Sequence, residues 1–95
     1  MRRTAVHHFR GKLFQGEKLC LDPANVYIDY DSREVDVTSN WSGYLLVKSE
    51  KDVVPGGSYT LKLEDGRAGQ LRIDTVTPDD SDKFQAIFVG EGSLG

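Results

Sequence analysis

The chain has 95 residues, of which 38% are hydrophobic and 28% are charged, and its net charge is −3. This length and composition are typical of one globular domain with a single core and argue against a disordered chain. A single cysteine excludes an internal disulfide and a cysteine-built zinc site, and no apolar run approaches the roughly 18 residues that a membrane helix needs. The first residues lack the apolar stretch of a signal peptide, so we expect a soluble, cytoplasmic protein.

Charge is distributed unevenly along the chain. Residues 1–20 carry five Lys or Arg and one Glu, whereas the rest of the chain carries seven Lys or Arg and fourteen Asp or Glu. A basic segment of this kind can grip an acidic partner, or it can form a first strand that lies against the acidic body of the same chain. On the first interpretation, the candidate partner-binding residues are Arg3, Arg10 and Lys12.

Short runs of alternating apolar and polar residues, separated by Gly, Pro, Asn, Asp and Ser, make up most of the chain. This pattern predicts strands over residues 5–14, 17–21, 25–30, 33–37, 43–49, 58–64, 69–76 and 84–89. The segment Thr77-Pro78-Asp79-Asp80 has the residues of a helix start, but too few residues follow it for more than one helical turn. The ends, residues 1–4 and 91–95, are expected to be flexible.

The stretch "YTLKLEDGRAGQLRI" (59–73) predicts a β-hairpin. Asp65-Gly66 between two alternating runs is a strong turn signal, and Gly69 suits a bulge in the returning strand. A turn centred on Asp65-Gly66 places Glu64 opposite Arg67, so we expect these two charges to pair across the tip. The charged tip is therefore interpreted as structural.

Two of the predicted strands are apolar on both faces. In 43–49, Tyr44 and Leu46 fall on one face and Leu45 and Val47 on the other, and 84–89 behaves similarly. Such strands are expected to be central or buried on both sides. The prediction for residues 1–95 is a single, mainly β domain: a small antiparallel β-barrel or two-sheet roll of six to eight short strands, with at most one short helical turn. A two-sheet sandwich is the alternative.

No constellation of residues suggests catalysis or metal binding. His7 and His8 are adjacent, so in a strand they point to opposite faces and cannot share an ion. Asp29-x-Asp31 starts like a calcium loop, but Glu34 occupies the position that requires glycine. Cys20 lies between leucines, where a buried, unreactive thiol is expected. We therefore expect neither an enzyme nor a metal or cofactor site.

Trp41 and Tyr44 are the aromatic candidates for a binding site. Trp41 stands at the entrance of a strand, between Asn40 and Ser42. Such a tryptophan either covers the core with its N–H bonded to backbone, or stays exposed and stacks on a ligand or peptide. The sequence leaves both interpretations open, and with the second one the rim from Trp41 to Tyr44 becomes a binding surface.

The region 36–89 resembles the PilZ domain, a six-stranded barrel that binds cyclic di-GMP. The shared outline consists of "DVTSNWSGYLLV", "GGSYTLKL", a hairpin and the aromatic strand "KFQAIFVG". The resemblance implies a β-barrel and, as a function, a small-ligand sensor that would use its N-terminal arginines to meet phosphates.

The two ligand-binding motifs of that family are not matched. The arginine pair R-x-x-x-R would need a second arginine four positions after Arg2 or Arg3, where the chain has valine and histidine. The turn motif D/N-x-S-x-x-G begins with Asn40-Trp41-Ser42, but Leu45 stands in place of its glycine.

Three hypotheses for function follow. The first is a non-catalytic binding or assembly module that acts through protein–protein contacts or self-association, using the basic first strand (Arg3, Arg10, Lys12) or the Trp41–Tyr44 rim. The second is a PilZ-like sensor of cyclic dinucleotides. The third is a β-barrel that binds nucleic acid weakly; the negative net charge argues against it.

Overall fold

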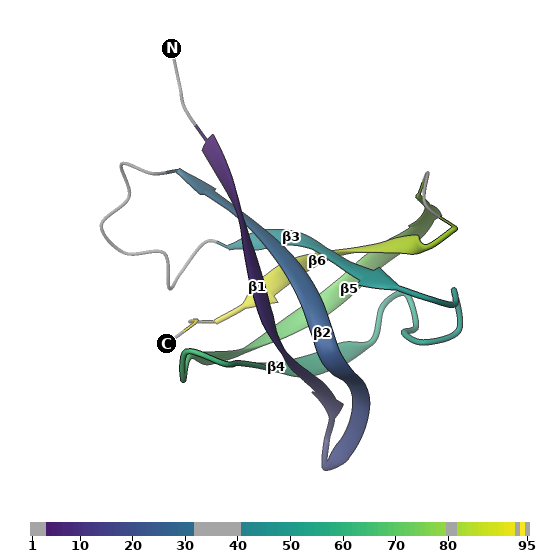
Figure 1. The fold of residues 1–95 in the computed structure, drawn as a ribbon. Coiled ribbons are helices and arrows are strands. Elements are labelled where there is room, and N and C mark those ends of the chain that lie inside the picture. Colours follow the sequence, from purple (N-terminus) through teal and green to yellow (C-terminus); the bar gives the residue numbers. More distant parts are fainter. Residues whose placement is uncertain (1–3, 32–40, 80–81, 93, 95) are drawn as a thin grey trace.

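Six antiparallel strands close into a small barrel in the computed structural model, which describes residues 4–31, 41–79, 82–92 and 94 (Figure 1). In chain order the strands are β1 (Thr4–Gln15), β2 (Lys18–Asp31), β3 (Ser42–Val47), β4 (Ser58–Leu63), β5 (Ala68–Pro78) and β6 (Phe84–Glu91). Their order around the barrel is β1-β2-β3-β6-β5-β4, and β4 pairs back to β1. The predicted mainly β fold and barrel are confirmed, and the described residues contain no helix.

Strands β1 and β2 form a long hairpin where the sequence predicted three shorter strands. The two-residue connection Gly16-Glu17 joins Gln15 to Lys18, and Gly16 has the positive φ of 62° that such tight turns use. Pro23 does not end β2. Between the pairs Gly11↔Ala24 and Leu13↔Leu21, β2 has one residue more than β1, and this extra residue forms a bulge. The proline therefore lies in a bulge, where a missing N–H leaves no ladder partner unsatisfied. The predicted strand 33–37 lies outside the described residues.

The barrel interior is filled by the inward side chains of all six strands. Strand β5 keeps its apolar residues inside by a bulge at Asp74, since Ile73 pairs with Phe88 but Thr75 already pairs with Ile87. The extra residue reverses the alternation, so that Val76 packs against the core and Thr75 faces out. The buried hydrophobic residues are Leu13, Ala24, Val26, Ile28, Trp41, Leu45, Val47, Val53, Tyr59, Leu61, Leu63, Leu71, Ile73, Ala86, Phe88 and Leu94.

Trp41 is one of these core residues. Only 3% of its surface is exposed, and its ring meets Phe88 edge to face at a centroid distance of 5.6 Å. Its indole N–H donates to the Gly92 carbonyl at 3.1 Å, and its carbonyl accepts from the Gly90 N–H at 2.7 Å. A methyl group at residue 90 would overlap the indole ring. The described part of the glycine-rich tail is thus attached to the barrel, and Leu94 is buried.

The turn between β4 and β5 differs in detail from the predicted one. The Leu63 carbonyl accepts from the Gly66 N–H, and the Leu63 N–H donates to the Arg67 carbonyl. The loop therefore has three residues, with Gly66 in a left-handed conformation at φ 100°. Arg67 pairs with Asp65, at 2.9 Å between Nη2 and Oδ2, and not with Glu64. The predicted pair required a two-residue turn, which would place Glu64 directly opposite Arg67. In the three-residue loop these two residues are no longer opposite each other.

Candidate functional site

A row of aromatic side chains crosses the outer surface of β1, β2 and β3. The strand registers place His8 opposite Tyr27 and Tyr27 opposite Tyr44. The three rings are stacked, with centroid distances of 4.7 Å between His8 and Tyr27 and 4.9 Å between Tyr27 and Tyr44. The register continues the row onto β6, where Ile87 lies opposite Tyr44. Cross-strand pairing, not proximity in sequence, thus assembles this row.

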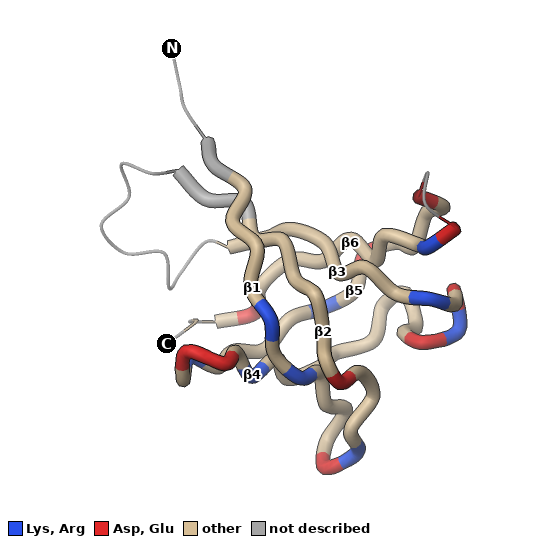
Figure 2. The backbone as a smooth tube through the Cα atoms, in the orientation of Figure 1, with Lys and Arg blue, Asp and Glu red and all other residues tan. Residues whose placement is uncertain are grey.

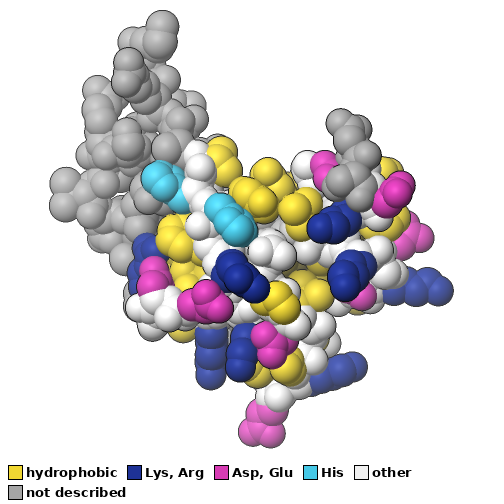
Figure 3. Space-filling model, viewed as in Figure 1, with side chains coloured by type: hydrophobic (Ala, Val, Ile, Leu, Met, Phe, Trp, Pro, Cys, Tyr) yellow, Lys and Arg dark blue, Asp and Glu magenta, His cyan; other side chains and the backbone are white. Residues whose placement is uncertain are grey.

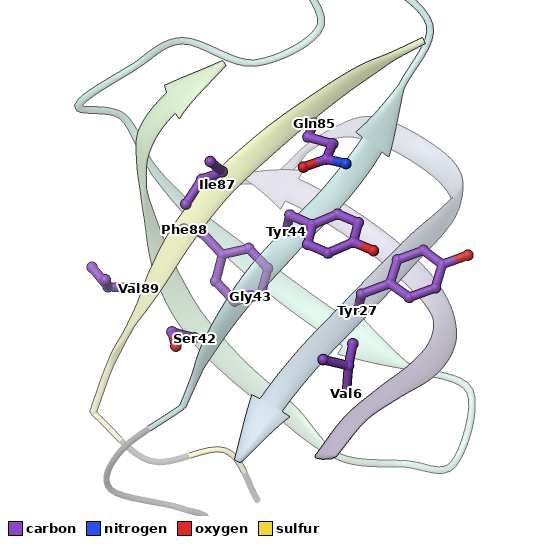
Figure 4. A pocket seen from close by; sticks show the side chains of 9 residues that line it. All are labelled: Val6, Tyr27, Ser42, Gly43, Tyr44, Gln85, Ile87, Phe88 and Val89. Atoms are coloured by element: carbon purple, nitrogen blue, oxygen red, sulfur yellow. The ribbon is translucent and has the colours of Figure 1, made fainter. Parts of the chain in front are cut away.

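Beside the row, the outer surface is hollowed into a groove of about 350 Å³, which is lined by residues of β2, β3 and β6 and by Val6 of β1 (Figure 4). We call the surface formed by Val6, Tyr27, Tyr44, Ile87 and Val89, all of which line the groove, the tyrosine face. Val6 is 56% exposed and Val89 is 39% exposed, although both are large apolar side chains. Figure 3 shows hydrophobic side chains grouped on this side of the molecule, beside the histidine side chains.

The tyrosine face is uncharged. The nine residues that line the groove include no Lys, Arg, Asp or Glu; its polar groups come from Tyr27, Tyr44, Ser42 and Gln85. Strand β3 carries no charged residue, and β6 carries only Glu91 at its end. Figure 2 shows charged residues in the turns, along β1 and toward the ends of other strands, whereas β3 carries none along its length. Contact with this surface must therefore depend on apolar burial and on hydrogen bonds to neutral groups.

Four of the five predicted site residues lie in the described part of the chain, and they do not form one site. Tyr44 belongs to the tyrosine face. Arg10 is exposed on the outer side of β1, two residues beyond His8. Trp41 is buried, so the interpretation as a core residue holds for it and its ring is not available for stacking on a ligand. Arg3 lies outside the described residues.

Lys12 belongs to a small, charge-balanced hollow at the other end of β1. Its ammonium group lies 4.0 Å from the Asp22 carboxylate, and the register places it opposite Lys62 of β4. Lys62 in turn stands over the ring of Phe14, 5.1 Å from its centroid. The hollow measures about 150 Å³ and also includes Glu64, so two lysines face two acidic residues. Such a balance gives no net attraction for an anion.

The described residues contain no cluster of three His, Cys, Asp or Glu side chains that could hold a metal ion. His8 lies on the outer face, where its Nε2 is 3.2 Å from the Asn25 side-chain oxygen. Cys20 is partly buried, and its thiol contacts the Lys18 carbonyl. None of the elements described here is a helix that could cross a membrane.

Sequence reasoning identified only Tyr44 of the tyrosine face. The signal for the rest was present in the two strands that are apolar on both faces, but that signal was interpreted as burial on both sides. In the structure the inner face of β3, with Leu45 and Val47, is buried, whereas Tyr44 and Leu46 on its outer face are only half-buried. The second apolar face is therefore a surface, and it marks the candidate site.

Comparison of the chain with protein-family models, with curated proteins and with solved structures finds no match.

Proposed function

We propose that the chain is a non-catalytic binding module that contacts a protein partner through the tyrosine face. The observation that carries the proposal is the groove of about 350 Å³, whose lining residues include two exposed valines and two half-buried tyrosines and no charged residue. Contiguous apolar surface of this kind on a folded domain is typical of interaction sites. Tyrosine is enriched at the centres of protein interfaces, where charged side chains are depleted.

A closed barrel also suits this mode of binding. The interior is occupied by core side chains from every strand, so a partner can be met only on the outside of the barrel or at its ends. Tyr27 and Tyr44 hold each other in a fixed stack on rigid strands. Two rigid aromatic side chains lose little conformational entropy on binding, which favours affinity.

The cyclic dinucleotide hypothesis finds less support at this groove. Cyclic dinucleotides carry two phosphates, which proteins bind with arginine, lysine or helix N-termini. The described residues that line the groove offer none of these groups. If such a ligand nevertheless binds, a saturating concentration of one hundred times its Kd should raise the free energy of unfolding by about 2.7 kcal/mol.

Site-specific photo-crosslinking in the cells that express the protein tests the proposal. A photoreactive amino acid replaces Tyr44 on β3 in one variant and Thr60 on β4, on the far side of the barrel, in another. We expect adducts with a discrete partner from position 44 and none from position 60.

A matched pair of valines gives the control. Val89→Ser changes the tyrosine face, whereas Val54→Ser makes the same change at a valine that is 58% exposed and does not line the groove. The adduct from position 44 should weaken in Val89→Ser and persist in Val54→Ser. Equal yields in both variants, or adducts from position 60 alone, would refute the proposal.

A further inference from the structure

Strand β1 is paired on both sides along only part of its length. It pairs with β2 from Thr4 to Gln15, but its pairing with β4 covers only Gly11–Phe14. One further hydrogen bond, from the Glu64 N–H to the Arg10 carbonyl at 2.9 Å, ends this ladder. There the chain turns away into the loop between β4 and β5. Upstream of Arg10, no strand among the described residues lies along this edge of β1.

The direction of the backbone groups on this edge follows from the register. In a strand, the N–H and C=O of one residue point to the same side, and those of the next residue to the other side. The Arg10 carbonyl points toward β4. The N–H and C=O groups of Val6 and His8, which have the same parity, therefore point in that direction too, away from β2. We call the segment Val6–Arg10 with these groups the β1 edge.

The side chains along the β1 edge indicate the chemistry of a partner. Val6, His8 and Arg10 are all exposed on the outer face. Within the described part of the chain no carboxylate forms an ion pair with Arg10, unlike Lys12, which pairs with Asp22. An added strand would place alternate side chains beside these three. Acidic side chains there would neutralise Arg10, whereas basic ones would be repelled.

We propose that the β1 edge accepts an extended, acidic segment of a partner protein as an additional strand. This strand would continue along β1 from the point where the pairing with β4 ends, at Glu64. Main-chain hydrogen bonds to Val6 and His8 supply the register, and carboxylates beside Arg10 supply the preference for an acidic sequence. The inference rests on the proposed function only in taking the partner to be a protein. It involves the edge of β1, whereas the proposed function concerns the groove; the two surfaces share only Val6.

The probe is a capped nine-residue peptide of alternating glutamate and threonine, compared with the same peptide in which lysine replaces glutamate. Binding is followed by amide chemical shifts and hydrogen exchange in solution. We expect the acidic peptide to shift the amide signals of Val6, His8 and Arg10 and to slow exchange at Val6 and His8. His7 and Phe9, whose groups point toward β2, should be protected before the peptide is added.

Two variants of equal charge change make the test specific. Arg10→Glu should weaken binding of the acidic peptide by about ten-fold or more, because it replaces an attraction by a repulsion. Lys12→Glu makes the same change two residues away, where β4 already occupies the edge, and should alter binding by about two-fold at most. Since both substitutions are on exposed side chains, the fold is expected to persist in both.

A third variant tests the main-chain contacts. His8→Pro removes an N–H that does not belong to the ladder with β2, so β1 should stay in place while peptide binding is lost.

Four results would overturn the inference: equal binding of the lysine peptide, equal effects of Arg10→Glu and Lys12→Glu, shifts centred on Tyr44 instead of the β1 edge, or protected Val6 and His8 amides in the free protein. The last result would mean that the chain or a second copy already covers the edge. A failed proposed function would instead appear as unchanged crosslinking in Val89→Ser, which leaves the β1 edge intact.

Discussion

Arg67 links the β4–β5 turn to the barrel through two contacts of a single side chain. Its guanidinium group bonds the Asp65 carboxylate, with 3.0 Å between Nε and Oδ2, and stands over the ring of Phe9 at 4.8 Å from the centroid. Its backbone N–H also donates to Asp65, at 3.0 Å. These bonds, led by the one from the side chain, hold the pKa of Asp65 below its usual value. Asp65 and Arg67 therefore neutralise each other within the turn.

The first prediction concerns this carboxylate. Arg67→Ala should raise the pKa of Asp65 toward its usual value, but not fully, because the backbone N–H of residue 67 remains. A pKa that is lowered in the folded state adds stability above the unfolded-state pKa, and this stability is lost as the pH falls through the folded-state pKa. The variant should therefore lose less stability than the wild type on acidification through that range.

An NMR titration of the Asp65 carboxyl carbon measures the effect. Arg72→Ala is the control, since Arg72 is an exposed arginine of β5 that forms no bond with Asp65. An unchanged pKa in Arg67→Ala, or an equal rise in Arg72→Ala, would contradict the assigned cause.

The burial of a single side chain cannot be predicted from sequence when it depends on a distant segment of the chain. For Trp41, the sequence left open whether the ring is buried or exposed, because that depends on where the tail after β6 lies. The tail binds the indole through Gly92, fifty-one positions away in the chain, and leaves space for the ring at Gly90. Glycine-rich composition indicates a flexible tail and contains no sign of such a partner.

At the scale of the strand, β3 explains the tyrosine face. Its inner residues Leu45 and Val47 are buried, while its outer residues Tyr44 and Leu46 remain half-buried. Neighbouring β6 repeats the pattern, with Ala86 and Phe88 inside and Ile87 outside. Side-chain alternation predicted these two sets of residues from the sequence alone. Only the barrel order, which places β3 beside β6, shows that the outer sets are adjacent.

The second prediction uses the two adjacent leucines of β3. Leu45→Ala should lower the free energy of unfolding by about 2–5 kcal/mol, because it leaves a cavity in a closed core. Leu46→Ala, on the outer face, should cost about 1 kcal/mol, since part of its surface already meets water. Urea denaturation measures both values. Equal losses for the two variants would mean that something covers the outer face as closely as the core fills the inner one.

The third prediction concerns the β4–β5 hairpin. Gly66→Val should destabilise the fold by about 1–3 kcal/mol, because a β-branched residue is strained at φ 100°. Gly66→Asn should cost clearly less, since asparagine tolerates left-handed conformations. A side chain at residue 66 would meet no atom within 4 Å, so the loss can be assigned to the backbone. A valine variant as stable as the wild type would contradict the turn geometry.

Elements were predicted well where alternation and turn residues agree. The runs 43–49, 58–64, 69–76 and 84–89 correspond to β3, β4, β5 and β6 with small shifts at their ends. The merging of 17–21 and 25–30 into β2 was missed because Pro23 usually ends a strand, whereas a bulge accommodates it here. Thr77 and Pro78 have the sequence signal of a helix start, but they belong to β5. They pair with Gln85 and Phe84 of β6, and this pairing outweighs the local helix signal.

For the whole molecule, closure of the barrel is the feature that the sequence could suggest but not specify. The β1–β4 ladder joins residues about fifty positions apart, and the β3–β6 ladder joins residues about forty apart. No local pattern encodes such pairings; they follow from burying the inward faces of all six strands at once. Because the tyrosine face draws on β1, β2, β3 and β6, it forms only when β6 pairs with β3. The sequence therefore indicated its residues without indicating the site.

We propose that the barrel binds its partner through the tyrosine face around Tyr44. Isotope-labelled protein, placed in an extract of the cells that express it, tests this claim residue by residue through the loss of amide signals. We expect losses to concentrate at Tyr27, Tyr44 and Ile87, to be reduced in Val89→Ser, and to be small at Thr60 and Gln70 on β4 and β5. Losses spread evenly over the barrel, or concentrated on β4 and β5 with Tyr44 unaffected, would contradict it.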